Sequence, residues 1–326
     1  MTKARDLADL GNKTSLDEIN DAYDAGALSN RNSVINGNFA FWQRGTSFSS
    51  SGYGADRWIY GTSGGVGVHS RQTFTGSDID TFGTQYFHRL AVSVGANNQG
   101  MSTTLEDLSM FAGKTFTLSF YAKGTNPAGG HLTTLIGGDT GSGGSGNWEV
   151  GGTNEIVLSS SWQKFTVTLT FPSMNGRTLG TSSYIYVYPA RQPSDDNTTN
   201  AWTMDMSQVQ LEVGDTATPF EHRSYGEELA KCQRYYQGSG RLIQTGDGVC
   251  GYLMASSLLP VEMRTTPTAV IKDNAGNTGK VSADSSNNIN GFVSGLQATM
   301  IAAGANNSVI GTNVFMSVHF TVDAEL

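Results

Sequence analysis

The sequence has 326 residues, of which 41 are glycine and only 15% are charged, and its formal net charge is -8 at pH 7. This length is sufficient for two domains with cores, and the negative charge argues against a nucleic-acid-binding protein, which needs a surplus of lysine and arginine. The N-terminus lacks the apolar segment of a secretory signal and no apolar run approaches the roughly 20 residues of a membrane span, so the sequence predicts a soluble protein made in a cytoplasm, without membrane insertion.

The first 32 residues are more polar and more helical in pattern than the rest of the chain. Ser15 and Glu18 have the spacing of a capping box, and two helices are predicted over residues 3–10 and 16–25. Helices this short and this polar are not stable alone in water, so they need a partner surface or each other. We expect residues 1–32 to form a helical N-terminal attachment segment, and a frayed terminus is the alternative.

Residues 33–222 consist mainly of short stretches in which apolar and polar residues alternate, as in a strand with one buried face. The clearest are residues 114–123 and 162–171, where every second residue is apolar. About nine such strands follow one another with no convincing helix between them, which favours a β-sandwich. The specific prediction is a jelly roll, in which the first and last strands are neighbours, so residues 34–41 should lie beside residues 206–213.

Residues 223–238 are predicted to form a short helix that bridges two β-domains. Ser224 and Glu227 have the form of a second capping box, and Gly238 and Gly240 are expected to end the helix. Apolar residues recur between them at helical spacing and predict a stripe that packs on another element: Tyr225, Leu229, Cys232 and Tyr236.

Residues 239–326 are predicted to form a smaller C-terminal β-sandwich. The stretch 267–283 is typical of two strands about a turn at residues 274–277, and the stretch 314–326 alternates along its length. Apolar residues on both faces of that last strand suit contacts between subunits or between domains.

Four stretches of the chain carry a resemblance to a known family. They are SVINGNFAFWQRGTSF with GYGADRWIY (33–60), QVQLEVGDTATPFEHRSYGEELAKCQRYYQ (208–237), LLPVEMRTTPTAVIKD (258–273) and FTVDAEL (320–326). In this order they resemble tail-fibre proteins of tailed bacteriophages and related prophages. The resemblance implies a virion tail protein assembled in the host cytoplasm, a homotrimer, and a jelly-roll domain like those of carbohydrate-binding modules. It also implies that residues 1–32 attach to other tail or baseplate proteins.

The best candidate for a binding surface is a stripe of tyrosines, because sugar recognition needs aromatic faces and planar polar groups. Tyr184, Tyr186 and Tyr188 alternate with two aliphatic residues, so they share one strand face if the aliphatic residues point into the core. Arg191 and Asp195 follow in a polar loop and complete the candidate glycan site. Tyrosines that belong to the core or to a trimer contact are the alternatives.

A second candidate for glycan binding is Trp148, which lies in the glycine-rich stretch 124–154 and has little local core to join. That stretch is either a flexible linker or a ligand-facing rim. Trp42, Trp58 and Trp162 occur in ordinary strand contexts and are expected in the core.

No metal or cofactor is predicted, although a structural Ca²⁺ is the one metal that the oxygen-rich loops could hold. Its candidate ligands are Asp205 on the last strand of the jelly roll and Asn36 and Asn38 on the first strand. The alternative is that these residues cap turns.

Catalysis is not expected. The five histidines are dispersed and lack the spacing of metal ligands. Adjacent acids such as Asp195 and Asp196 are typical of solvated turns, and the sequence lacks the repeat of a parallel β-helix, the fold common in depolymerising tailspikes.

The sequence therefore predicts a tail fibre or receptor-binding protein that attaches to a host-surface glycan without catalysis. A purely structural tail or baseplate spacer without a receptor is the main alternative. A polysaccharide-cleaving tailspike is a further one.

Overall fold

The computed structural model describes residues 30–196, 198–246, 252–283, 286–306 and 314–325. The chain divides into two compact units, with the boundary between Ser224 and Tyr225. The two helices predicted near the N-terminus, and with them almost all of the predicted attachment segment 1–32, lie outside the described residues, so these remain predictions.

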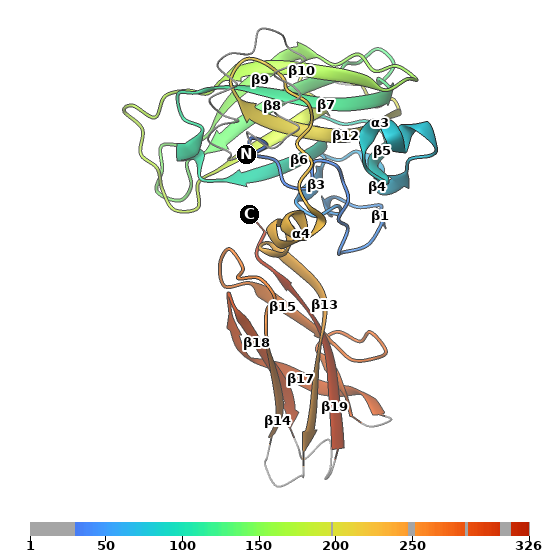
Figure 1. Ribbon diagram of the computed structural model, residues 1–326, viewed down its shortest axis with the longest axis vertical. Helices are drawn as coiled ribbons and strands as arrows, with labels where there is room; N and C mark the ends of the chain where they lie inside the picture. The colour runs from blue at the N-terminus through green and yellow to red at the C-terminus, as the bar shows by residue number, and fades with distance from the viewer. Residues whose placement is uncertain (1–29, 197, 247–251, 284–285, 307–313, 326) are drawn as a thin grey trace, which may run out of the picture. The chain divides into compact units, whose positions relative to one another are not determined.

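The N-terminal unit is a sandwich of two antiparallel six-stranded sheets (Figure 1). Sheet A has the strand order β1-β4-β5-β12-β7-β10, and sheet B has the order β2-β3-β6-β11-β8-β9. The chain passes repeatedly from one sheet to the other, which is the pattern of a jelly roll, and the predicted mostly-β fold is confirmed. The strands of sheet A are β1 (Ser47–Phe48), β4 (Val66–Thr73), β5 (Tyr86–Val94), β7 (Thr115–Thr125), β10 (Gln163–Thr170) and β12 (Trp202–Val213). Those of sheet B are β2 (Gly52–Tyr53), β3 (Trp58–Gly61), β6 (Gln99–Glu106), β8 (Thr133–Asp139), β9 (Trp148–Glu155) and β11 (Tyr184–Gln192).

Four elements of this unit differ from the sequence prediction. The strand β6 was not predicted because most of its residues are buried on both faces, so apolar and polar residues do not alternate. Strand β9 begins at Trp148, inside the stretch 124–154 that was expected to be a flexible linker or a ligand-facing rim. A short helix, α3 (Ser77–Phe82), interrupts the run of strands, and a 3-10 turn (Leu108–Met110) follows β6.

The core of the sandwich lies between the two sheets. Leu118 and Phe120 of β7 point into it and are fully buried, as the alternation predicts. Trp58 packs against Phe39 with ring centroids 4.8 Å apart, and Trp42 is 8% exposed, so both tryptophans lie in the core as expected. Such aromatic pairs add specific packing energy to the area they bury.

Trp162 does not join that core. It packs in a separate aromatic cluster with Phe74, Phe82, Phe87 and Tyr121, where Tyr121 lies on the face of β7 opposite to the core residues. The cluster therefore lies on the outer face of sheet A, where α3 contributes Phe82 to it.

The first and last segments of the sandwich lie side by side. The backbone N–H of Ser33 donates to Leu211 O at 2.9 Å, and the N–H of Val209 donates to Gly37 O at 2.9 Å. These bonds confirm the predicted pairing, although the first segment is too irregular to form a regular strand.

A β-bulge in β12 makes this pairing possible. β12 pairs with β5 as far as Met206. Its register against β7 then shifts between Ser207 and Gln210, and Gln208 takes a left-handed φ of 51°. Beyond the bulge the edge of β12 is released from β5 and pairs with the first segment instead.

Side-chain hydrogen bonds also hold the first segment against the end of β12. Glu221, which follows β12, accepts hydrogen bonds from the backbone N–H groups of Asn30 and Asn32. Arg223 donates to the backbone oxygens of Val34 and Asn32. The chain therefore enters and leaves the sandwich at one place.

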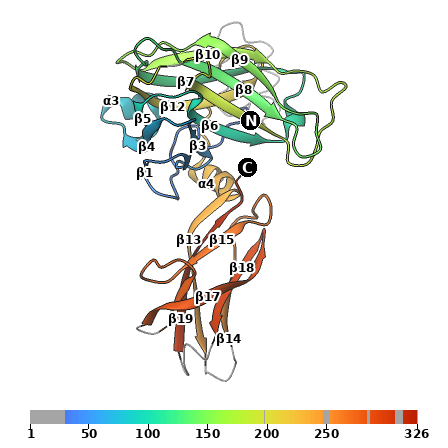
Figure 2. The same ribbon diagram turned by 180° about the vertical axis from the view of Figure 1, so that it is seen from behind.

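The C-terminal unit has one curled antiparallel sheet of seven strands rather than two stacked sheets (Figure 2). Six strands follow the order β13-β19-β16-β17-β18-β14, and β15 pairs with β19. Register shifts interrupt three of the pairings, which lets a single sheet bend around its own core. Its strands are β13 (Tyr236–Gly246), β14 (Tyr252–Leu258), β15 (Thr268–Lys272), β16 (Lys280–Ala283), β17 (Ser286–Gln297), β18 (Met300–Asn306) and β19 (Val314–Asp323).

The bridging helix is shorter than predicted. Helix α4 (Tyr225–Gln233) ends before Tyr236, which begins a strand, and Tyr225 is 72% exposed rather than packed. Gly240 lies within β13, where a Cβ atom would meet the Phe320 ring at 2.0 Å, so this glycine permits a close ring contact instead of ending a helix. Within the described ranges, no helix has the length and apolar character needed to cross a membrane.

Candidate functional site

The outer face of sheet B carries the three tyrosines predicted to form a binding stripe. On β11, Ile185 and Val187 are fully buried in the core, whereas the tyrosines on either side of them are half-buried on the opposite face. We call Tyr184, Tyr186 and Tyr188 the tyrosine platform. Its ring centroids are 6.4 and 6.3 Å apart, and the rings are tilted by 53° and 80° to one another, so they form a row of tilted faces and edges.

Neighbouring strands hold Tyr186 in place. It lies directly opposite Gly137 of β8, and a Cβ atom at that glycine would come within 2.1 Å of the tyrosine Cζ atom. The ring therefore occupies space that only glycine leaves open. The Tyr186 hydroxyl reaches across β8 and donates to Glu149 Oε1 of β9 at 3.0 Å.

Tyr184 has a similar carboxylate partner. It is the direct cross-strand neighbour of Asp139 on β8. Burial raises the pKa of Tyr184, and the charge of Asp139 together with its hydrogen bond to the tyrosine adds to the increase. Burial and the charge of Glu149 likewise raise the pKa of Tyr186. Both tyrosines are therefore neutral phenols that can donate a hydrogen bond at neutral pH.

A β-bulge brings Arg191 to the same face. Simple alternation places residue 191 on the side opposite to the tyrosines, but the register of β11 against β8 shifts between Tyr188 and Arg191 and adds one residue. The Arg191 guanidinium lies 5.6 Å from the centroid of the Tyr188 ring, and its Nη1 atom donates to Asn98 Oδ1. Arg191 is only 8% exposed, so it supports the end of the platform more than it extends into solvent.

Asp195 lies in the loop beyond Arg191 and has a different neighbour. Its Oδ1 atom is 3.9 Å from Nε2 of His131, and its side chain is 80% exposed. The adjacent Asp196 is buried and accepts hydrogen bonds from the backbone N–H groups of His131 and Thr198, so it fixes the loop. The structure thus brings Arg191 to the tyrosines and places Asp195 beside His131.

The arrangement suits a ligand that has both apolar C–H faces and hydroxyl groups. The platform supplies aromatic surface, while Asp139 and Glu149 supply acceptors for hydroxyl donors. Sequence reasoning missed both carboxylates because only strand register sets them beside the tyrosines. The one local signal for Glu149 in the sequence was its position next to Trp148, a predicted site residue.

No protein-family model matches the sequence, and the search of curated proteins found no match. Among solved structures, the chain is similar to a xylan-binding domain from Paenibacillus barcinonensis (TM-score 0.33, 14% identity, 52% of this chain and 98% of that one). It is also similar to the N-terminal cellulose-binding domain of a β-1,4-glucanase from Cellulomonas fimi (TM-score 0.30, 20% identity, 53% and 97%). A third is the enzymatically active domain of a tailspike protein from bacteriophage CBA120 (TM-score 0.32, 15% identity, 56% and 22%).

The chain thus has distant structural similarity to carbohydrate-binding β-sandwiches and to a phage tailspike domain. No family is shown. The chain spans less than a quarter of that tailspike domain's length.

Trp148 is not the exposed loop residue that the sequence suggested. It is 8% exposed, begins β9 and belongs to the main core cluster. Its ring packs edge-on against Phe171 at 5.4 Å and lies over Gly138, where a Cβ atom would approach it within 2.4 Å. The prediction failed because strand pairing brings a core to a tryptophan whose sequence neighbours are glycines.

The suggested Ca²⁺ ligands are engaged elsewhere. Both carboxylate oxygens of Asp205 accept hydrogen bonds from Arg89, at 2.6 and 2.7 Å. The side-chain oxygen of Asn36 accepts from the backbone N–H of Phe41, and that of Asn38 lies 3.4 Å from the N–H of Ala40. The two asparagines cap turns, as the alternative prediction stated, whereas Asp205 forms an ion pair that was not predicted. The described residues contain no group of three His, Cys, Asp or Glu side chains placed to hold a metal.

Proposed function

We propose that this protein binds an uncharged, hydroxyl-rich glycan along the tyrosine platform, without catalysis, and that this binding attaches a bacteriophage tail to its host. The observation that carries the proposal is the row of three half-buried tyrosine rings on one sheet face, with carboxylate acceptors at two of them. Sugar rings have an apolar C–H side that fits aromatic faces and hydroxyl groups that donate to carboxylates.

The charge of the platform defines the preferred glycan. Asp139 and Glu149 would repel an acidic sugar, while they accept hydrogen bonds from neutral hydroxyl groups. The tyrosine hydroxyls that these carboxylates hold are fixed in direction, which lowers the entropy cost of ordering the site on binding.

A shallow face of this kind gives weak binding at each site, and attachment would depend on several linked copies. We infer that the protein is a homotrimer. Several large apolar side chains of the C-terminal unit are exposed, among them Ile243, Met254 and Leu258, at 50%, 51% and 76%. Exposed apolar residues of this size are suited to contacts between subunits.

Substitution of Tyr186 by alanine is expected to weaken binding of the intact protein to its glycan about tenfold or more, since a stacked aromatic side chain contributes about 1–3 kcal/mol. The ligand is found by glycan array, and the affinities are measured by isothermal titration calorimetry. Tyr225→Ala serves as the matched control, because it removes a tyrosine that is 72% exposed outside the platform. If the Tyr186 variant and the unaltered protein bind the glycan with equal affinity, the tyrosine platform is not the binding site.

Light scattering coupled to size-exclusion chromatography is expected to give three times the chain mass of 34.6 kDa. A monomer would contradict the fibre proposal. A trimer that binds no glycan on the array would favour the structural spacer. A fall in polysaccharide viscosity that is lost in Asp195→Asn would instead favour a tailspike hydrolase.

A further inference from the structure

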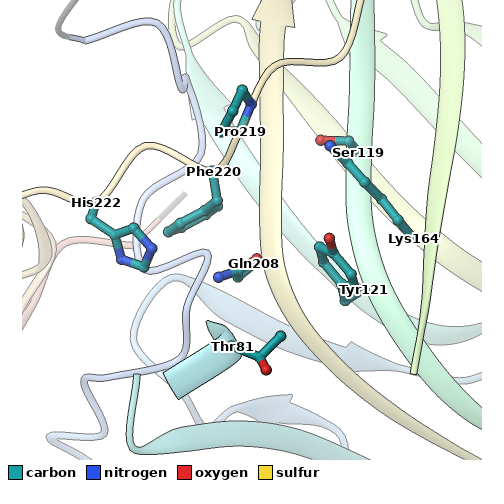
Figure 3. A pocket seen from close by; sticks show the side chains of 8 residues that line it. All are labelled: Thr81, Ser119, Tyr121, Lys164, Gln208, Pro219, Phe220 and His222. Carbon is teal, nitrogen blue, oxygen red and sulfur yellow. The ribbon is translucent and has the colours of Figure 1, made fainter. Parts of the chain in front are cut away.

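A polar pocket on the other sheet of the sandwich has no role in the proposed function. It has a volume of about 250 Å³ and lies on the outer face of sheet A, so it is separated from the tyrosine platform by the core (Figure 3). β7, β10, β12, α3 and the segment after β12 line it, with Thr81, Ser119, Tyr121, Lys164, Gln208, Pro219, Phe220 and His222. Figure 3 shows Phe220 and His222 on one side of Gln208, with Tyr121 and Lys164 on the other.

The wall of the pocket is held in place by hydrogen bonds. The backbone N–H of Glu221 donates to Gln210 Oε1 at 2.8 Å, and Gln210 Nε2 lies 3.2 Å from Pro219 O. On the other side, Gln208 Nε2 donates to Phe82 O at the end of α3, at 2.7 Å. The segment 219–222 and the helix are therefore fixed against the sheet, and the cavity is part of the folded structure.

The lining is suited to a negatively charged ligand. None of the eight lining residues is acidic, and they include the ammonium group of Lys164 and the imidazole of His222. The nearby carboxylate of Glu212 already accepts hydrogen bonds from the backbone N–H and the hydroxyl of Thr218. Arg31 lies 3.9 Å from the same carboxylate and partly offsets its charge, so an anion in the pocket would meet mainly donors.

Lys164 remains accessible to such a ligand. Its Nζ atom donates to Thr218 O at 3.2 Å, which leaves two of the three ammonium protons for other acceptors. Loss of hydration lowers the pKa of Lys164, and the charge of Glu212 opposes this effect. A bound carboxylate would offset the lost hydration, so ligand binding and the positive charge would stabilise each other.

Size and the remaining groups restrict the ligand further. A volume of about 250 Å³ lies just below the range of about 300–1,000 Å³ that is common for small-molecule pockets, so one small ring is the unit that fits it best. The rings of Tyr121 and Phe220 supply apolar faces, and Ser119, Thr81 and Gln208 supply hydroxyl and amide groups. A sugar needs this combination, because aromatic rings fit its apolar C–H faces and small polar groups bind its hydroxyl groups.

We propose that this pocket binds one acidic sugar unit, a uronic acid, with its carboxylate against Lys164 and its ring between Tyr121 and Phe220. The site is distinct from the tyrosine platform in location and in charge preference. It does not depend on the platform function, and each proposal can fail without the other.

The test uses the full chain and four small probes: D-glucuronate, methyl β-D-glucuronide, D-glucose and acetate. Saturation-transfer NMR and calorimetry are expected to show binding of glucuronate or its methyl glycoside, and affinity for glucose and for acetate at least tenfold weaker. Binding of the methyl glycoside assigns the site to a unit of a polysaccharide, and binding of the free acid alone assigns it to a free sugar acid. Equal affinity for glucose or for acetate, or no binding of either uronate at millimolar concentration, would overturn the proposal.

Matched variants place the ligand in the pocket. Lys164→Met is expected to weaken uronate binding at least tenfold, while Lys114→Met, which removes another lysine whose ammonium group donates to a backbone carbonyl, should not change it. Tyr186→Ala should also leave uronate binding unchanged, and Lys164→Met should leave platform binding unchanged. Equal uronate affinity of Lys164→Met and the unaltered protein, with both proteins folded by circular dichroism, would overturn the assignment to Lys164.

Discussion

Acidification from pH 7 to pH 4 is expected to lower the free energy of unfolding of the sandwich by about 3 kcal/mol or more, because two histidines are buried in its core. His69 and His88 are both 0% exposed, and their rings stack 6.0 Å apart. Burial lowers the pKa of His69 to about 4. Burial, and to a smaller extent the neighbouring His69, lowers the pKa of His88 well below its usual value.

The direction of the effect follows from which state binds the protons. Well above about pH 6.5 both imidazoles are neutral in the folded and unfolded chains, so they do not change stability with pH. As the pH falls from 6.5 towards 4, the unfolded chain binds protons that the folded chain cannot accept, and the free energy of unfolding decreases. For His69 the decrease is complete once the pH is below about 4.

Denaturant unfolding between pH 7 and pH 4, followed by tryptophan fluorescence, measures this effect in the sandwich alone, since all five tryptophans lie between residues 42 and 202. His69→Leu and His88→Leu are each expected to reduce the slope of stability against pH, whatever they do to stability at pH 7. His319→Leu, in the C-terminal unit, is the control and should leave the slope unchanged. If the slope of stability against pH is equal in the unaltered protein and in all three variants, the prediction is contradicted.

Substitution of Gly137 by alanine is expected to weaken glycan binding about as much as removal of the Tyr186 ring, that is about tenfold, although it deletes no platform atom. The added Cβ atom would come within 2.1 Å of Cζ and 2.2 Å of the hydroxyl oxygen of Tyr186. The ring must move, and its hydrogen bond to Glu149 is lost. Because the contact lies on the outer face of sheet B, the core stays intact.

A double-mutant cycle tests this mechanism directly. If Gly137→Ala acts only by displacing the ring, then it has no further effect on affinity in a chain that already carries Tyr186→Ala. Gly226→Ala is the control substitution, since a Cβ atom there meets nothing within 4 Å. Additive losses in the double variant would mean that Gly137 affects binding by another route.

The parts of this fold that depend on local alternation were predictable from the sequence. Ile185 and Val187 point inward and leave the tyrosines between them on one outer face, as their spacing indicates. The same reasoning gave the core face of β7, while the pairing of the first and last segments followed from the choice of a jelly roll.

The parts that depend on register or on distant contacts were not predictable. Arg191 was predicted beside the tyrosines as a loop residue, but it lies in β11 and reaches their face because a bulge adds a residue to that strand. Glu149 reaches the tyrosines only because β9 pairs with β8. Trp148 was misassigned for a related reason, since its burial comes from residues distant in sequence, such as Phe171. The pocket around Lys164 combines residues from 81 to 222 and has no local sequence pattern.

The place where the chain both enters and leaves the sandwich has a mechanical consequence. Its entry at residues 30–34 and its exit at residues 221–223 are bonded directly to each other and to the end of β12. A pull along the backbone would act on these few bonds before it reached most of the strand pairs of either sheet. The outer faces of both sheets would then stay undistorted while the chain on either side of the sandwich is under tension.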